Sequence, residues 1–309
     1  MRLEPSSLQA RTDIVDHRAT SSEGLLVEAT VSPDSAVLQT FYASYDAAFV
    51  LPNEKEAFDG FAACLALNFG DAYDRLSQQY GAFREIVLVA RDPGGALVGG
   101  ANLIAFPLRD HGVLSTNLNY VFVIAEQRRQ GHFKRLVAAI GEVVAAFFAP
   151  ADAALPRLIF IEQNDPVQMS PADYAHDTQH SGIDQMTRIR LWTALGAKIV
   201  DFPYVQPPLS AAQAADDALV YAVLGARGDA LDACLLHAHL LRFFGISVLK
   251  GGDPHADGVA GPQLAALALH CSRGDAIPLL TAANLPLQMR EGFEAGGRTS
   301  LRELIKAGA

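Results

Sequence analysis

Residues 118–148 read LNYVFVIAEQRRQGHFKRLVAAIGEVVAAFF. The first part, Leu118–Ile124, is an apolar run typical of a buried strand, and the polar residues 125–130 follow it. From Gly131 onward the apolar residues recur at the 3.6-residue period of a helix. They are Leu136, Val137, Ile140, Val143, Val144, Phe147 and Phe148. This stretch therefore predicts a strand, a short loop and a helix in succession.

The joint between this loop and this helix has the composition of an anion site. Arg128 and Arg129 lie just before the helix, and Gly131 lies at its start. The first N–H groups of a helix have no partners within it and carry partial positive charge, so they bind phosphate well. Arginines at that end are unfavourable unless an anion is present. Because a glycine also lets the backbone approach an anion closely, the joint predicts a phosphate or pyrophosphate site.

The sequence on both sides of this stretch predicts further strands and helices. Before it come a strand at 25–31, helices at 34–49 and near 54–69, and a hairpin of strands 85–91 and 96–106. After it come a strand at 157–162, a polar segment at 165–183, a helix at 184–195, and strands near 198–205 and 218–225. Only helices are expected after residue 225, at 230–244, 262–272 and 299–307. Gly99-Gly100 indicates a bulge or a close backbone approach within the hairpin.

This order of elements predicts a mixed α/β domain over 24–225. A flexible tail is expected at 1–23, and a small helical extension at 226–309, which we expect to be a separate appendage.

The stretch Val123–Leu136 resembles the acetyl-coenzyme-A-binding motif of the GNAT N-acetyltransferase superfamily, which reads Arg/Gln-x-x-Gly-x-Gly/Ala. Arg128 and Gly131 match the motif, whereas Phe133 stands where the family usually has glycine or alanine. The order of elements over 24–225 is also similar. The segment 191–210, LWTALGAKIVDFPYVQPPLS, resembles the end of the family's fourth helix and its following strand. The resemblance covers about two-thirds of the chain.

The resemblance implies a GNAT-like central mixed sheet with flanking helices, in which the motif strand and the next strand splay apart. The pantetheine of acetyl-CoA would lie in that gap beside Phe122 and Val123, and N–H groups from 129 to 133 would hold the pyrophosphate. Gln185 and Trp192 stand where many relatives have an asparagine and an acidic tyrosine. The cofactor-binding residues implied are Phe122, Val123, Arg128, Arg129, Gln130, Gly131, His132, Phe133, Gln185 and Trp192.

The resemblance also implies that an amine attacks the thioester directly, with no protein nucleophile. For a base, Glu162 ends a strand facing the cleft, and Asp165 follows in the loop. A solvated or arginine-paired Glu162 is the alternative. Because the indole of Trp192 is no practical acid, water, Tyr174 or Tyr204 would protonate the leaving thiolate.

Charge and hydropathy restrict the partners of this protein. The 309 residues carry a net charge of −10, which argues against nucleic acid, and the acidic excess lies before residue 225. That acidity favours a cationic amine as acceptor. The apolar stretch Leu136–Pro150 is too short to span a membrane, and the N-terminus has no apolar signal-peptide core. We therefore expect a cytoplasmic protein, with a homo-oligomer left open.

The cysteine and histidine residues predict neither a disulfide framework nor a metal site. Cys64, Cys234 and Cys271 are widely spaced in apolar surroundings, so buried thiols in a reducing compartment are expected. His176 and His180 imitate a metal site, but no strong helical pattern surrounds them.

The favoured function is an acetyl-CoA-dependent N-acetyltransferase acting on a primary amine of a small molecule or a protein. The alternative is a non-catalytic acyl-CoA-binding module for sensing or protein interaction. A third reading, an interaction protein built on the tail, would need an exposed apolar patch on 226–309.

Overall fold

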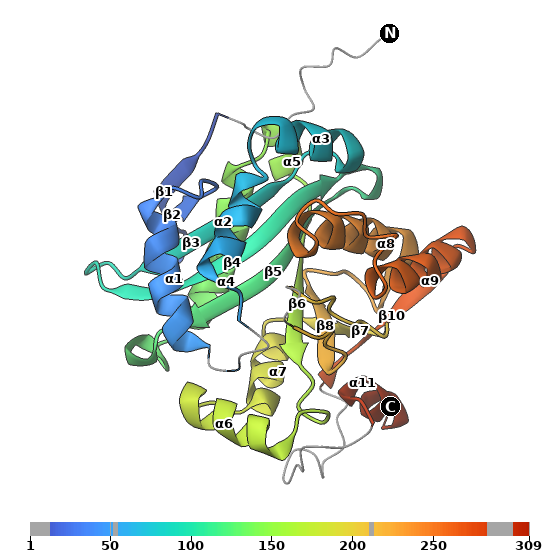
Figure 1. The fold of residues 1–309 in the computed structure, drawn as a ribbon. Helices are drawn as coiled ribbons and strands as arrows, with labels where there is room; N and C mark the ends of the chain where they lie inside the picture. Colours follow the sequence, from blue (N-terminus) through green and yellow to red (C-terminus); the bar gives the residue numbers. More distant parts are fainter. Residues whose placement is uncertain (1–12, 50, 52–54, 210–212, 283–298, 309) are drawn as a thin grey trace. The chain divides into compact units, whose positions relative to one another are not determined.

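The computed structural model describes residues 13–49, 51, 55–209, 213–282 and 299–308 (Figure 1). The chain divides into two compact units. Among the described residues, unit 1 comprises 13–49, 55–157 and 245–252, and unit 2 comprises 51, 158–244, 253–282 and 299–308. Each unit is a sheet with helices, so the mixed α/β class expected from the sequence is confirmed.

Unit 1 contains five antiparallel strands that neighbour one another in chain order. They are β1 (Asp16–Thr20), β2 (Leu26–Thr30), β3 (Arg84–Arg91), β4 (Leu97–Leu108) and β5 (Val113–Val123). The helices are α1 (Ala36–Ala48), α2 (Phe58–Ala66), α3 (Gly70–Tyr80), α4 (His132–Ala146) and α5 (Pro150–Ala153), with 3-10 turns at Arg109–His111 and Ala125–Gln127.

The glycine pair in β4 permits a close approach of neighbouring strands, as the sequence indicated. A Cβ atom on Gly99 would lie 2.0 Å from the carbonyl oxygen of Phe122 on β5. A Cβ atom on Gly100 would lie 2.7 Å from the carbonyl oxygen of Leu88 on β3. Since real side chains do not reach such distances, only glycine fits between these backbones.

Aromatic residues dominate the core on the α1 side of this sheet. Phe41, Tyr45, Phe61 and Phe122 are all buried in one cluster with residues of β3. The rings of Tyr45 and Phe61 pack edge to face with centroids 4.9 Å apart. Their burial fixes α1 and α2 on the sheet and holds the end of β5, which leads into the motif loop.

Unit 2 contains five antiparallel strands in the order β6-β8-β7-β10-β9. Their bounds are β6 (Arg157–Asn164), β7 (Lys198–Val200), β8 (Leu219–Leu224), β9 (Ala230–Asp232) and β10 (Ala276–Leu280). The helices are α6 (Pro171–Ser181), α7 (Gln185–Ala194), α8 (Ala233–Arg242), α9 (Ala260–Ser272) and α11 (Leu301–Ala307). A π-helical turn spans Phe243–Val248, and its residues 245–248 belong to unit 1.

Several expectations from the sequence are wrong. The segment 226–309 is not helical throughout, because it forms β9 and β10, and β10 pairs with β7. Residues 13–23 of the expected flexible tail include β1, while residues 1–12 lie outside the described part of the chain. The polar segment 165–183 contains α6, and α3 was not expected at all. The helix expected near 54–69 is α2, and residues 52–54 lie outside the described residues.

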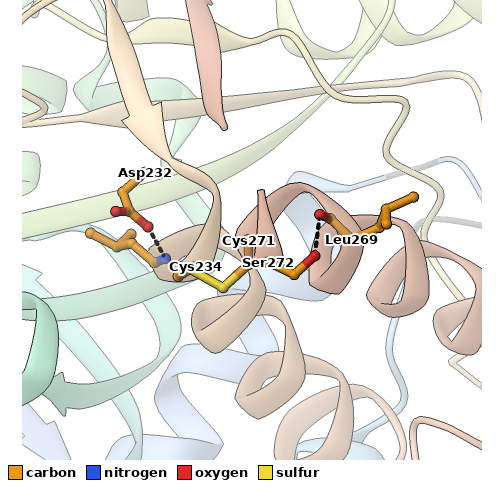
Figure 2. Close-up of a disulfide and its surroundings, with 6 residues drawn as sticks. Asp232, Cys234, Leu269, Cys271 and Ser272 are labelled. Atoms are coloured by element: carbon orange, nitrogen blue, oxygen red, sulfur yellow. Dashed lines mark hydrogen bonds between the residues drawn. A yellow bond between two sulfur atoms is a disulfide. The ribbon is translucent and has the colours of Figure 1, made fainter. Parts of the chain in front are cut away.

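The expectation of three thiols is also wrong, because Cys234 and Cys271 form a disulfide (Figure 2). The two cysteines are 37 residues apart in sequence but 4.5 Å apart between Cα atoms, on α8 and α9. Figure 2 also shows Asp232, whose carboxylate accepts the N–H of Leu235 at 2.9 Å and so caps α8. Cys64 is a free, buried cysteine. Within the described residues, no helix combines the length and the apolar character needed to cross a membrane.

Candidate functional site

The motif loop and the first turn of α4 form the first group of candidate residues, within unit 1. Gly131 caps α4 at φ +76°, and Arg129 also has a positive φ of 62°. A Cβ atom on Gly131 would meet nothing within 4 Å, so the space beside this helix start is open. The first N–H groups of α4 precede the i→i−4 ladder of the helix. The geometry therefore suits an anion approaching the backbone at Gly131.

The side chains of the loop hold its shape. The Nε of Arg128 donates to the carbonyl oxygen of Val123 at 3.1 Å and ties the loop to the end of β5. Gln130 donates to the carbonyl oxygen of Glu126 at 3.3 Å. Arg129 and Gln130 are exposed, and Arg128 and Phe133 are half-buried. The exposed guanidinium of Arg129 can therefore add positive charge to this helix start.

Two other motif residues, His132 and Phe122, have side chains buried in the interior of unit 1. His132 is buried, and its Nδ1 lies 3.2 Å from a guanidinium nitrogen of Arg135. The ring of Phe122 is buried, with its centroid 5.7 Å from that of Phe41. The side chain of Phe122 is thus part of the core, and only its backbone could meet a ligand.

The second group of candidates lies in unit 2 and centres on Glu162 of β6. The hydroxyl of Tyr204 donates to Glu162 and also contacts the side-chain oxygen of Gln206. The pKa of Glu162 is raised to about 7. Burial is the largest cause, the hydrogen bond from Tyr204 acts in the opposite direction, and the nearby Asp216 adds to the increase. A carboxyl group with such a pKa exchanges a proton near neutral pH, as a general base must. The pair expected from the sequence as base and acid candidates is thus in direct contact.

Aromatic residues hold this pair in place. Glu162 faces Tyr221 across the β6–β8 ladder, and the ring of Tyr221 stacks on that of Tyr204 with centroids 4.4 Å apart. The hydroxyl of Tyr221 lies 2.7 Å from Nε2 of His239, which is fully buried on α8 and stacks on Phe160. Burial lowers the pKa of His239 well below its ordinary value, so this imidazole is neutral.

Sequence reasoning missed Tyr221, His239, Gln206 and Asp216. A signal exists for Tyr221, since a hydroxyl inside the apolar run LVYAVL needs a buried partner. No local pattern indicates that His239 is that partner, because the two residues meet only through packing of α8 on the sheet.

The contacts of Asp165 favour a structural role over that of a base. Its side chain is 1% exposed. One carboxylate oxygen accepts the N–H of Val167 at 2.9 Å, and the other accepts the N–H of Leu301 at 2.7 Å. Asp165 therefore ties the start of α11 to the end of β6.

The remaining candidates on α6 and α7 also have partners. The amide of Gln185 is buried and donates to Asp177 at 2.9 Å, and Asp177 also pairs with Arg188. That contact leaves the Gln185 amide engaged rather than facing a ligand. Trp192 is 5% exposed. Tyr174 donates to Asp184, and burial raises its pKa to about 12, which makes it a weak acid.

The described residues contain no group of three or more His, Cys, Asp or Glu side chains placed to hold a metal ion.

Comparisons with solved structures find matches of low sequence identity. One is described as a GNAT-family acetyltransferase from Bacteroides thetaiotaomicron, with 14% identity, a TM-score of 0.42, and coverage of 78% of this chain and 100% of that chain. Another is a ribosomal-protein alanine N-acetyltransferase from Escherichia coli, with 15% identity, a TM-score of 0.35, and coverage of 65% and 96%. A third is described as a GNAT-family acetyltransferase from Desulfovibrio desulfuricans, with 17% identity, a TM-score of 0.34, and coverage of 65% and 99%.

The first and third of these structures are described as members of the GNAT family. At such TM-scores the likeness assigns no substrate and no residue role. No protein-family model matches the chain, and no curated protein matches it.

Proposed function

We propose that this protein is an N-acetyltransferase that moves the acetyl group of acetyl-CoA to a primary amine. The observation that carries the proposal is the start of α4. There an arginine-rich loop leads to Gly131, which has a positive φ and open space beside it. Coenzyme A has a pyrophosphate, the anion that suits N–H groups and guanidinium at a helix start.

In this proposal the backbone of residues 129–133 and the exposed Arg129 bind the pyrophosphate. The amine nitrogen attacks the carbonyl carbon of the thioester, a C–N bond forms, and the C–S bond breaks. Glu162 accepts the proton that the ammonium must lose, either directly or through water. Tyr204 positions this carboxylate through its hydrogen bond. Coenzyme A leaves as a thiolate and takes its proton from water, since Trp192 is no practical acid.

The test is release of free thiol from acetyl-CoA by the full chain with a panel of primary amines. We expect release that depends on the amine, and acetylated amine in equal amount. Release without acetylated amine would contradict acetyl transfer, as would failure of every amine in the panel.

A non-catalytic acyl-CoA-binding module is the second candidate, favoured by two observations. The indole of Trp192 stands where an acid is expected, and the amide of Gln185 is engaged by Asp177. Both candidates bind coenzyme A. If the protein binds coenzyme A but no amine in the panel gives thiol release, the non-catalytic module is favoured. If the protein does not bind coenzyme A and releases no thiol, both candidate functions are rejected.

A further inference from the structure

Tyr204, which donates to the candidate base, lies on backbone that is neither helix nor strand. The segment 201–209 follows β7 in unit 2. At its start the N–H of Asp201 donates to a carbonyl oxygen of β10 at 2.8 Å. Beyond Tyr204, the backbones of Gln206 and Asp216 pair with each other at 2.8 and 3.0 Å. How the backbone between these two anchors is held determines where the Tyr204 hydroxyl lies.

A side chain of α9 holds the residue that follows Tyr204. Oε1 of Gln263 accepts the N–H of Val205 at 2.9 Å, and Nε2 of Gln263 donates to the carbonyl oxygen of Val205 at 2.9 Å. The same Nε2 donates to the carbonyl oxygen of Val259, one helical turn earlier, at 2.9 Å. One amide therefore satisfies both backbone groups of Val205, as a neighbouring strand would in a sheet.

The surroundings of Gln263 indicate that this position requires an amide. The side chain is buried, and the other buried residues of α9 are the apolar Ala260, Leu264 and Leu267. A buried amide is costly unless its polar atoms are paired. Exchanging the oxygen and the nitrogen would set an N–H against the N–H of Val205, so the hydrogen bonds fix one orientation. Gln263 is thus specific for the backbone that it holds.

This contact reaches the candidate base through a single residue. Val205 follows Tyr204 directly in the chain, and the Tyr204 hydroxyl donates to Glu162. We propose that Gln263 is a positioning residue, which holds the Tyr204 hydroxyl on the Glu162 carboxylate through the backbone of Val205. The role of Gln263 in catalysis rests on the proposed function, whereas its effect on the contact between Tyr204 and Glu162 does not.

The groups that act on the pKa of Glu162 respond differently to loss of this positioning. The hydrogen bond from Tyr204 lowers that pKa, and the charge of Asp216 raises it. Tyr221 lies opposite Glu162 on β8, and its hydroxyl bonds His239 on α8. The α9 amide bonds neither Asp216 nor Tyr221. Losing the amide should therefore weaken the Tyr204 hydrogen bond and raise the pKa of Glu162.

The test is a titration of the Glu162 carboxyl group in the full chain, without acetyl-CoA or an amine. Carbon-13 NMR follows the side-chain carboxyl groups of glutamate, and the absence of one signal in Glu162→Gln identifies that of Glu162. Gln263→Met keeps nearly the same side-chain length and removes the hydrogen bonds. It should raise the pKa of Glu162 by at least about 0.5, a part of what a hydrogen bond to a charged group contributes.

A double-mutant cycle tests whether this effect passes through Tyr204. In a Tyr204→Phe background, Gln263→Met should cause no further rise, because no hydroxyl remains to be positioned. The matched control is Leu264→Val, which trims a buried neighbour on the same helix and leaves the amide in place. This control should lower the stability measured by urea unfolding and leave the pKa of Glu162 unchanged.

A second variant serves if Gln263→Met does not fold. Gln263→Glu keeps an acceptor for the N–H of Val205 and loses the donor for its carbonyl oxygen. Its negative charge acts on Glu162 whether or not Tyr204 has a hydroxyl. Only the part of the rise that disappears in the Tyr204→Phe background therefore reports positioning.

Three results would overturn the proposal. The first is a pKa of Glu162 in Gln263→Met equal to that of the parent. The second is an equal rise with and without the Tyr204 hydroxyl, for either substitution of Gln263. The third is an equal rise in Leu264→Val. Failure of the proposed function would be seen instead as absence of thiol release, which none of these titrations measures.

Discussion

The hydroxyl of Tyr204 donates a hydrogen bond to the carboxylate of Glu162, and the ring of Tyr204 is almost fully buried. Burial raises the pKa of Glu162, whereas this hydrogen bond stabilises the ionised form and lowers it. The resulting pKa of about 7 gives the carboxyl group a proton to exchange near neutral pH. Tyr204 thereby acts on the acid–base behaviour of Glu162.

Replacing Tyr204 with phenylalanine should move the pH dependence of turnover. Tyr204→Phe removes the hydroxyl that stabilises the ionised carboxylate, so the pKa of Glu162 should rise. Since only ionised Glu162 accepts a proton, the rising limb of the pH–rate profile should shift to higher pH. The affinity for coenzyme A should stay the same. If the rising limb of the variant's pH–rate profile lies at the same pH as that of the parent, this hydrogen bond does not set the pKa of Glu162.

Two substitutions at Gly131 should separate backbone strain from charge. Asparagine and aspartate have the same shape, and both tolerate a positive φ better than other side chains. Gly131→Asn should therefore fold and lower the affinity for coenzyme A only modestly. Gly131→Asp should fold equally well and lower it at least about tenfold more, because its carboxylate would face the pyrophosphate. Equal affinities of the two variants, measured by calorimetry, would argue against an anion at this helix start.

Glu85 on β3 should make the stability of the protein depend on pH. Its side chain is fully buried, and this burial raises its pKa to about 8, although a hydrogen bond with Ser247 and the charge of Lys250 act in the opposite direction. Because the folded-state pKa lies above the ordinary value of 4.5, the folded state binds this proton more tightly. The stability that proton binding by Glu85 contributes is thus fully present below about pH 4.5 and is lost as the pH rises through about 8.

Glu85→Gln keeps the shape of the neutral side chain and removes the titration. At pH 8 this substitution should raise the free energy of unfolding by roughly 1–3 kcal/mol. Between pH 5 and 8 the free energy of unfolding should depend less on pH than it does in the parent. Urea unfolding at several pH values measures this, with the exposed Glu23→Gln as control. The prediction is contradicted if the free energy of unfolding changes with pH in the same way in Glu85→Gln and in the parent.

A chain that ends at Arg227 should not fold stably. Truncation removes β10, which pairs with β7, and also removes the residues 245–252 that belong to unit 1. It exposes the face of β8 on which His239 packs against Tyr221. We expect an insoluble product or one without cooperative unfolding in urea. Soluble, cooperatively unfolding protein would show instead that 226–309 is the separate appendage that its composition indicates.

Local patterns predicted the parts of the fold that depend on local physics. The helix period after Gly131 predicted α4, and the two strand patterns at 85–91 and 96–106 predicted the β3–β4 hairpin. Glu162 could be selected from the sequence because a carboxylate follows the apolar run there, although β6 continues two residues further, to Asn164. The sequence indicates Tyr204 only as one of two tyrosines that could act as the acid, and it does not predict the contact of Tyr204 with Glu162, which lies 42 residues earlier.

The parts that the sequence did not reveal depend on tertiary packing. The Cys234–Cys271 disulfide forms because α8 and α9 lie side by side, which no cysteine spacing encodes. β10 was missed because its five residues include Pro278, which weakens any strand pattern. The sequence does not reveal that Asp165 is structural, because its partner Leu301 lies 136 residues away.

The most direct measurement is the rate of thiol release from acetyl-CoA, with an accepted amine, by the parent and by Glu162→Gln across a range of pH. Glutamine keeps the shape of Glu162 and cannot accept a proton, so the rate near neutral pH should fall at least about tenfold. Coenzyme A affinity should be unchanged, and the defect should shrink at high pH, where more of the amine is already neutral. If Glu162→Gln matches the parent at every pH, Glu162 is not the base and the account is contradicted.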